Sequence, residues 1–74
     1  MSRCILIEVI DREIYTEMYD NVDKAWYALV GKFRDFCAEN ECELEQDCNI
    51  NHNWYSAWAN GTFSCADWQL RVIE

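Results

Sequence analysis

The chain has 74 residues, of which 51% are hydrophobic and 15% aromatic, so it has enough apolar side chains for one core and too little length for two. Its 14 acidic and 6 basic side chains give a formal net charge of -8, which repels phosphate groups and argues against direct binding to nucleic acid or to an anionic membrane. We therefore expect a single domain over residues 1–74, with a basic protein surface as its partner.

The apolar segments and the cysteines indicate a cytoplasmic protein. The longest apolar run, residues 5–7, is far too short to span a membrane, and the N-terminus lacks the charged and apolar regions of a signal peptide. The five cysteines are odd in number, which argues against a complete disulfide framework. We expect reduced thiols, with Cys4, Cys37 and Cys65 buried because they lie in apolar periodic segments.

The first part of the chain predicts a β-hairpin. Residues 3–10 favour a strand near the middle of a sheet, because they are rich in β-branched side chains and place Ile5, Ile7 and Val9 on one face. Asp11 and Arg12 predict a tight turn, although they lack the Asn-Gly or Asp-Gly pair that favours two-residue loops. The mixed acidic and aromatic side chains of residues 13–19 then suit an edge strand.

Apolar residues at helical spacing predict an amphipathic helix over residues 22–39. Asp20 or Asn21 can cap its N-terminus, and Asn40 is a suitable end. Gly31 costs about 1 kcal/mol relative to alanine inside a helix, so it either marks a close approach to the sheet or is a tolerated exposed glycine. The apolar stripe consists of Val22, Trp26, Leu29, Val30, Phe33 and Cys37.

An acidic side chain occupies every second position after this helix. The four residues are Glu41, Glu43, Glu45 and Asp47, and they lie in a stretch from Asp35 to Leu70 that has no lysine or arginine. If the segment is extended, its carboxylates form a one-sided row at roughly 6.6 to 6.8 Å spacing, on the scale of successive phosphates. Such a row suits a basic partner; the alternative is a solvated edge strand whose charges discourage aggregation.

The C-terminal third predicts a turn followed by two strands. The asparagines at positions 49, 51 and 53 indicate the turn, and aromatic segments follow at residues 52–59 and 62–73. Between them, Asn60 and Gly61 are a strong hairpin signal, because both residues tolerate positive φ. The side chains expected to pack on the helix are Trp54 and Trp58 on one strand, and Trp68, Leu70 and Val72 on the other.

Together these elements predict an α+β fold. It consists of an antiparallel sheet of four or five strands with one amphipathic helix packed on one face. The expected element order is ββα, followed by a C-terminal hairpin or meander. A single helix leaves the second face uncovered. The aromatic residues expected on that face or at its rim are Tyr15, Tyr19, Tyr55 and Phe63. Aromatics there favour a homodimer or another partner contact, and the alternative is that they are scattered surface residues.

No constellation in the sequence indicates catalysis or a cofactor. The spacing C-x4-C-x5-C-x3-H of Cys37, Cys42, Cys48 and His52 resembles the ligand order of CCCH zinc fingers. However, Cys37 lies on the apolar stripe, and the acidic surroundings contradict the RNA-binding role of those fingers. The chain lacks G-x-S-x-G, P-loop and H-E-x-x-H motifs, so we expect no enzymatic activity, no catalytic residue, no metal and no cofactor.

In size, acidity and lack of catalytic motifs the whole chain resembles the small anti-CRISPR and anti-restriction proteins of phages and plasmids. The resemblance is one of profile, without a shared motif, and it implies an inhibitor of a nucleic-acid-processing enzyme that imitates nucleic acid. From the charge spacing we expect the partner to contact Glu41, Glu43, Glu45 and Asp47, with Tyr55 and Trp58 as anchors. The alternative function is a homo-oligomeric scaffold that pairs through the uncovered sheet face.

Overall fold

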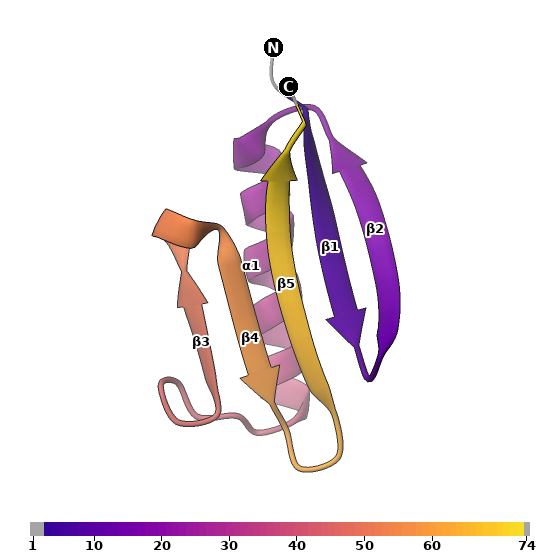
Figure 1. Cartoon of the computed structure of the whole chain (residues 1–74). Coiled ribbons are helices and arrows are strands. Elements are labelled where there is room, and N and C mark those ends of the chain that lie inside the picture. The colour runs from indigo at the N-terminus through magenta and orange to yellow at the C-terminus, as the bar shows by residue number, and fades with distance from the viewer. Residues whose placement is uncertain (1–2, 74) are drawn as a thin grey trace.

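The computed structural model describes residues 3–73, which form a five-stranded antiparallel sheet with one α-helix packed on one face (Figure 1). The elements are β1 (Cys4–Ile10), β2 (Glu13–Tyr19), α1 (Val22–Glu39), β3 (Cys48–Asn51), the short 3-10 helix η1 (His52–Trp54), β4 (Ser56–Asn60) and β5 (Cys65–Val72). The strand order is β2-β1-β5-β4-β3, so the first and last strands are neighbours inside the sheet. The predicted α+β fold is confirmed, with β3, β4 and β5 as the C-terminal meander.

The turn between β1 and β2 uses two residues in the left-handed region. Asp11 and Arg12 have φ of 50° and 76°, which gives the mirror-image turn whose twist matches a hairpin. The Asp11 carboxylate supports this turn by accepting hydrogen bonds from Ser64 Oγ (2.6 Å) and from the backbone N of Cys65 (3.0 Å). The tight turn predicted at these two positions is confirmed, as is the edge position of β2.

The bounds of α1 are those predicted from its caps and its apolar periodicity. The Asn21 side chain accepts a hydrogen bond from the backbone N of Lys24 (2.8 Å). Asn40 ends the helix by donating from its backbone and side-chain nitrogens to Phe36 O, at 3.0 and 2.9 Å. Gly31 is exposed, and a Cβ built on it meets no neighbouring group within 4 Å. It is therefore the tolerated surface glycine and not a point of close approach to the sheet.

The core lies between α1 and the sheet and is built around Trp68 of β5. This indole is 1% exposed and packs edge-on against Phe33 and Phe36, with ring centroids 5.8 and 5.6 Å apart. Small side chains around it allow the helix to approach the sheet closely. The buried core consists of Cys4, Leu6, Ala25, Leu29, Phe33, Cys48, Ala57, Ala59, Ala66, Trp68 and Leu70. The expected burial of Trp68 and Leu70 is therefore confirmed.

Three side chains that we expected against the helix are exposed instead. Trp54, Trp58 and Val72 are 75%, 38% and 53% exposed. In β4 the helix-facing positions belong to Ala57 and Ala59, which are buried. Because side chains alternate along a strand, Trp58 points to the face opposite the helix. The predicted parity of this strand was wrong by one position, and such an error places every side chain of the row on the wrong face. Val72 has the helix-side parity but lies at the last position of β5.

The β4–β5 hairpin exists, but its loop is longer than the sequence indicated. β4 ends at Asn60 and β5 begins at Cys65, and the backbone N of Gly61 donates to Ser64 O (2.7 Å) across the loop. Asn60 is not among the residues with positive φ, and neither is Gly61. Gly61 is needed for a different reason, since a Cβ there would come within 2.8 Å of Asn40 Cβ at the end of α1.

Two smaller expectations were also wrong. Asn49 and Asn51 belong to β3, so the predicted turn is limited to η1, which Asn51 caps with its side-chain oxygen. Cys65 is exposed, whereas Cys4 is buried and Cys37 is half-buried. The reason for the second error is again strand parity, because Cys65 alternates with the buried residue that follows it in β5.

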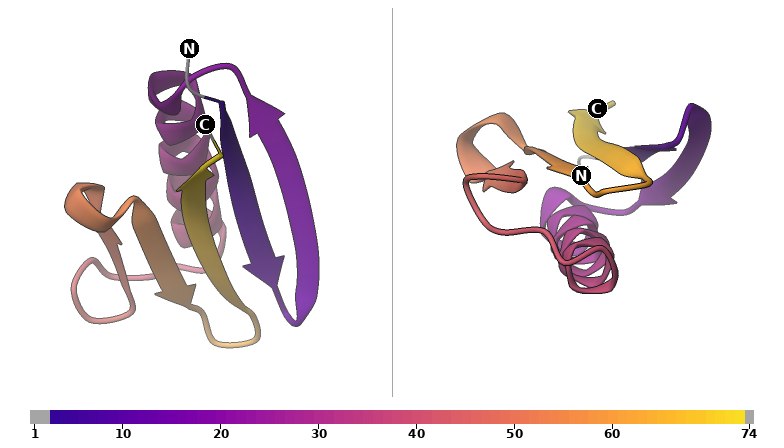
Figure 2. Two further views of the ribbon diagram at one scale, coloured as in Figure 1. Left: turned by 45° about the horizontal axis from the view of Figure 1, so that its top comes forward. Right: turned by 90° about the horizontal axis from the view of Figure 1, so that it is seen from below.

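No described element covers the second face of the sheet, as Figure 2 shows most clearly in its end-on view, where α1 lies on one side only. Tyr15 and Tyr19 lie at the rim on β2, but with the parity of the helix side, because Tyr19 pairs with buried Cys4. The residues of β2 that project from the uncovered side are Ile14 and Met18, which are 69% and 53% exposed.

Candidate functional site

The predicted row of carboxylates lies in a loop. Glu41, Glu43, Glu45 and Asp47 belong to the connection between α1 and β3, outside both elements. Glu41 and Glu45 have φ of 52° and 73°, and the backbone N of Asp47 donates to Glu43 O (2.8 Å), which closes a turn. The expected extended, one-sided row was therefore wrong, and so was the alternative of an edge strand. The left-handed residues Glu41 and Glu45 each turn the chain, so the acids do not continue along one face.

Hydrogen bonds nevertheless give this loop a defined shape. The backbone N of Cys42 donates to Cys37 O (3.0 Å), which is the closing bond of a Schellman motif with Glu41 at the left-handed position. The backbone N of Glu43 donates to Asp47 Oδ2 (3.0 Å), so one of the four carboxylates also serves the loop itself. The remaining acidic side chains project from a backbone that these bonds hold in place.

Six carboxylates lie along the C-terminal half of α1 and the loop that connects it to β3, and we call them the acidic end. They are Asp35, Glu39, Glu41, Glu43, Glu45 and Asp47, all exposed except half-buried Asp47. A helix C-terminus carries partial negative charge, and the last turn of α1 contains no basic residue that would offset it. The acidic end is therefore a stretch of uncompensated negative charge, which a basic surface would complement.

Two of these carboxylates occupy backbone positions that favour glycine. A left-handed backbone costs about 1 to 2 kcal/mol for a residue with a Cβ. Glu41 and Glu45 both have this backbone conformation, and at Glu41 most helices would place glycine or asparagine. The chain thus has carboxylates where the backbone favours other residues, and this kind of local cost is concentrated at functional sites.

Tyr55 and Trp58 do not lie beside the acidic end. Tyr55 follows η1, at the opposite end of β3 from the acidic loop (Figure 1), and packs on Trp26 with ring centroids 5.9 Å apart. Trp58 lies in the middle of β4 and points to the uncovered face. The structure therefore distributes the six predicted partner-binding residues over three places and does not bring the two aromatics to the carboxylates.

The aromatic side chain at the acidic end is Phe63, which is 96% exposed. It lies in the β4–β5 loop and borders a hollow of about 410 Å³ that is also lined by Glu39, Asn40, Glu41 and Thr62. An exposed ring beside carboxylates suits an arginine or lysine side chain, because the ring face attracts a cation. We expected Phe63 at the rim without linking it to the acids; the signal for that link is Gly61, which allows the loop to approach Asn40.

Three thiols come together near the end of α1. Burial, followed by the neighbouring thiols of Cys48 and Cys42, raises the pKa of Cys37 to about 12. His52 is not part of this cluster, because it packs against Trp26 with ring centroids 4.8 Å apart. The zinc-finger ligand order is thus not assembled, and within residues 3–73 no three such groups are arranged to hold a metal ion. A protonated thiol is also a poor nucleophile.

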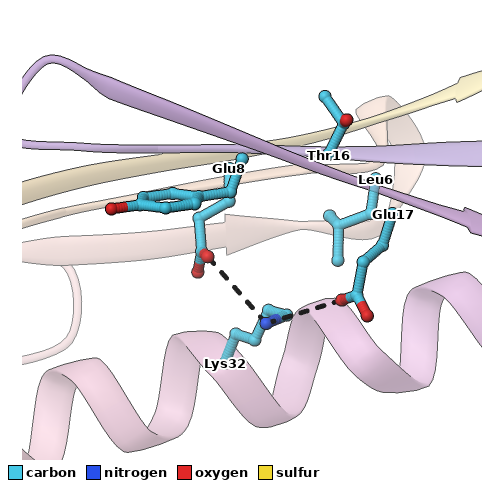
Figure 3. A pocket seen from close by; sticks show the side chains of 6 residues that line it. Leu6, Glu8, Thr16, Glu17 and Lys32 are labelled. Carbon is cyan, nitrogen blue, oxygen red and sulfur yellow. Dashed lines mark ion pairs between the residues drawn. The ribbon is translucent and has the colours of Figure 1, made fainter.

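The remaining polar cluster joins α1 to β1 and β2 (Figure 3). Glu8 Oε2 accepts a hydrogen bond from Trp68 Nε1 (2.6 Å), and Lys32 Nζ lies 3.9 Å from Glu8 Oε1 and 3.7 Å from Glu17 Oε1. These groups border a hollow of about 310 Å³ whose wall includes Leu6. Every charged group of the cluster has a partner within it, so the cluster fastens the helix to the sheet and offers no free acid, base or nucleophile.

Comparisons with known proteins add no relative to this description. No protein-family model matches the chain, and neither the curated proteins nor the solved structures contain a significant match. In the part of the chain that the structure describes, no helix combines the length and the apolar character needed to cross a membrane. The function must therefore be argued from the residues themselves.

Proposed function

We propose that this protein binds a basic surface of a nucleic-acid-binding protein through its acidic end and inhibits that protein by occupying the site of the nucleic acid. The observation that supports the proposal is the run of six carboxylates from the C-terminal half of α1 through the loop to β3, two of them on left-handed backbone. Neither the uncompensated charge nor a glutamate in place of glycine at the left-handed positions helps the fold, whereas both are explained if the carboxylates serve a partner.

The chemistry of recognition follows from the carboxylates. Arginine and lysine side chains that hold phosphates also pair with carboxylates, and arginine can do so through two parallel hydrogen bonds. Because the acids lie on a turn and not in a row, the protein would imitate the charge of nucleic acid and not the regular spacing of its phosphates. Such an interface associates rapidly and weakens steeply as the salt concentration rises.

Phe63 supplies the apolar part of the proposed contact. Binding energy is concentrated in a few desolvated anchors, often aromatic ones, surrounded by polar groups. Phe63 is the exposed aromatic beside Glu39 and Glu41, so it takes the anchoring role that the sequence predicted for Tyr55 and Trp58. A role for those two residues in partner binding stays a prediction, at sites separate from the acidic end.

The test compares two variants with the same loss of charge. E41Q/E43Q/E45Q removes three charges from the acidic end and leaves Asp47, which bonds to the loop backbone. The control E17Q/D20N/D23N removes three exposed charges from β2, from the connection that follows it and from the first turn of α1. Each protein is immobilised, exposed to nuclease-treated lysate of the natural host, and eluted with a salt gradient.

The proposal predicts that the native chain and the control retain the same nucleic-acid-binding protein and release it at similar salt. The acidic-end variant should fail to retain it. Added nucleic acid should displace the captured protein, because the two compete for one site. Equal retention by both variants would refute the role of the acidic end.

A further inference from the structure

The uncovered face of the sheet has a defined set of side chains, which we call the open face. Leu6, Trp68 and Ala57 are buried under the helix, so their strand neighbours point the other way; Figure 3 shows this alternation, with Thr16 directed away from the helix and Leu6, Glu8 and Glu17 toward it. The open face consists of Ile5, Ile7, Val9, Ile14, Thr16, Met18, Asn49, Asn51, Ser56, Trp58, Asn60, Cys65, Asp67, Gln69 and Arg71.

The open face is the part of the sheet from which charge is nearly absent. Among its residues, Asp67 is the one acid and Arg71 the one base, whereas the whole chain carries a formal net charge of -8. The half formed by β1 and β2 is aliphatic, with Ile14 beside Val9 and Met18 beside Ile5 across the strands. Two copies that meet through this face would keep most of their acids, including the acidic end, outside the contact.

The two charges of the open face are placed symmetrically. Asp67 and Arg71 lie on β5, the central strand of the sheet, at equal distances along the chain from Gln69. At about 3.4 Å per residue they are roughly 14 Å apart. Consider a two-fold axis in the plane of contact that crosses the strands at a right angle and passes over Gln69. Rotation about this axis brings Asp67 of one copy opposite Arg71 of the second copy, and Arg71 of the first copy opposite Asp67 of the second.

The same axis also matches the apolar half with itself. Ile7 pairs with Gln69, so Ile7 lies near the axis as well. Rotation about it brings the row of Met18, Ile5 and Arg71 onto the row of Ile14, Val9 and Asp67 in the second copy. One operation thus opposes aliphatic to aliphatic side chains and acid to base, with the sheets about 10 Å apart and within about 30° of antiparallel.

We propose that the open face is a homodimer interface in which two sheets pack face to face about this axis. Strands about 4.8 Å apart and about 24 Å long give a flat area of roughly 500 Å² per copy, so the pair buries about 1,000 Å², which is the lower limit for a specific interface. The dimer should accordingly be reversible, with a Kd in the micromolar range, and it would present two acidic ends facing outward. The inference is independent of the proposed function.

The experiment exchanges the two charges. Sedimentation equilibrium up to about 200 μM protein, where a micromolar complex is saturated, measures the Kd of the native chain and of the variants D67R, R71D and D67R/R71D. Each single variant places like charges opposite each other twice in the dimer and should weaken it at least about tenfold. The double variant restores opposite charges and should return the Kd to within about threefold of the native value.

Two controls keep the result decisive. R34D makes the same charge change as R71D on the exposed side of α1 and should leave the Kd nearly unchanged. Circular dichroism shows whether each variant folds; if D67R does not, M18E replaces it, because Met18 lies on the exposed edge strand. A native chain that stays monomeric at about 200 μM, or a folded double variant that does not regain the dimer, overturns the proposal.

Discussion

The Trp68–Glu8 hydrogen bond allows the energetics of the fold to be tested at one position. Trp68 is 1% exposed, and its Nε1 donates to Glu8 Oε2 at 2.6 Å. E8A removes the acceptor and leaves a buried donor unpaired, which costs about 1 to 3 kcal/mol. The pairing of Glu8 with Lys32 at 3.9 Å is partly exposed and adds at most about 0.5 kcal/mol. We therefore expect E8A to lower the free energy of unfolding by about 2 to 3 kcal/mol.

That loss is large for a chain of this length, whose total stability is about 4 to 11 kcal/mol. It corresponds to a fall in Tm of about 10 to 20 °C. E8Q retains a neutral acceptor for the indole and should cost only about 1 kcal/mol, because charge assistance roughly doubles the strength of a hydrogen bond.

E17A is the matched control for the ion pair. Glu17 lies 3.7 Å from the same lysine, but its side chain is 58% exposed and it does not contact Trp68. It should cost less than about 0.5 kcal/mol. Urea denaturation followed by tryptophan fluorescence and circular dichroism measures all three variants. Equal losses for E8A and E17A would show that the buried hydrogen bond does not contribute as argued.

Three further predictions concern the loops and the thiols. E41G should raise the free energy of unfolding by about 0.5 to 1 kcal/mol, because relief of the left-handed backbone strain exceeds the entropy cost of glycine. E43G should lower the free energy of unfolding, because φ of Glu43 is not positive. Urea midpoints measure both changes. The Ser64 hydroxyl and the Cys65 backbone N lower the pKa of Asp11 below its ordinary value of 3.8. The stability gained from this lowered pKa is present above about pH 4 and is lost as the pH falls through the folded-state pKa. The urea midpoint of the native chain should therefore fall more steeply than that of D11N between about pH 4 and pH 2. Parallel curves for the two proteins would contradict the role of these hydrogen bonds. At about pH 8, iodoacetamide should label exposed Cys65 much faster than Cys37, whose pKa is raised to about 12, and peptide mass spectrometry would contradict this if the rates were equal.

The elements predicted correctly are those that local chemistry determines. Asn21 and Asn40 cap α1 at the positions that the sequence indicated, because side-chain capping depends on the nearest few residues. The same holds for the turn at Asp11 and Arg12, although its support comes from Ser64, far away in the chain. The hydrogen bond between Ser64 and Asp11 could not be predicted from the sequence, so this part of the turn's support is known only from the structure.

The errors arose where the outcome depends on contacts distant in sequence. The parity of β4 is set by packing against α1, which favours Ala57 and Ala59 over Trp58 inside. The alternative row of this strand contains the larger apolar side chain Trp58. Side-chain size alone therefore favoured burial of Trp58, which is the wrong parity.

The acidic segment failed for a related reason. Its alternation is compatible with a strand, but the Schellman end of α1 turns the chain at Glu41, and a second left-handed residue, Glu45, turns it again. The candidate site could therefore be predicted as a set of charges near the helix end. Its shape and its aromatic neighbour Phe63 could not, since both depend on how two loops meet.

The most direct test of the acidic end is the salt dependence of its affinity. Once the captured protein is purified, its Kd for the native chain, for E41Q/E43Q/E45Q and for E17Q/D20N/D23N is measured by isothermal titration calorimetry over a range of salt concentrations. We predict a steep dependence of log Kd on log salt for the native chain and the control, and a clearly shallower one, with weaker binding, for the acidic-end variant. Equal slopes and affinities for all three proteins would contradict the assignment of partner binding to the acidic end.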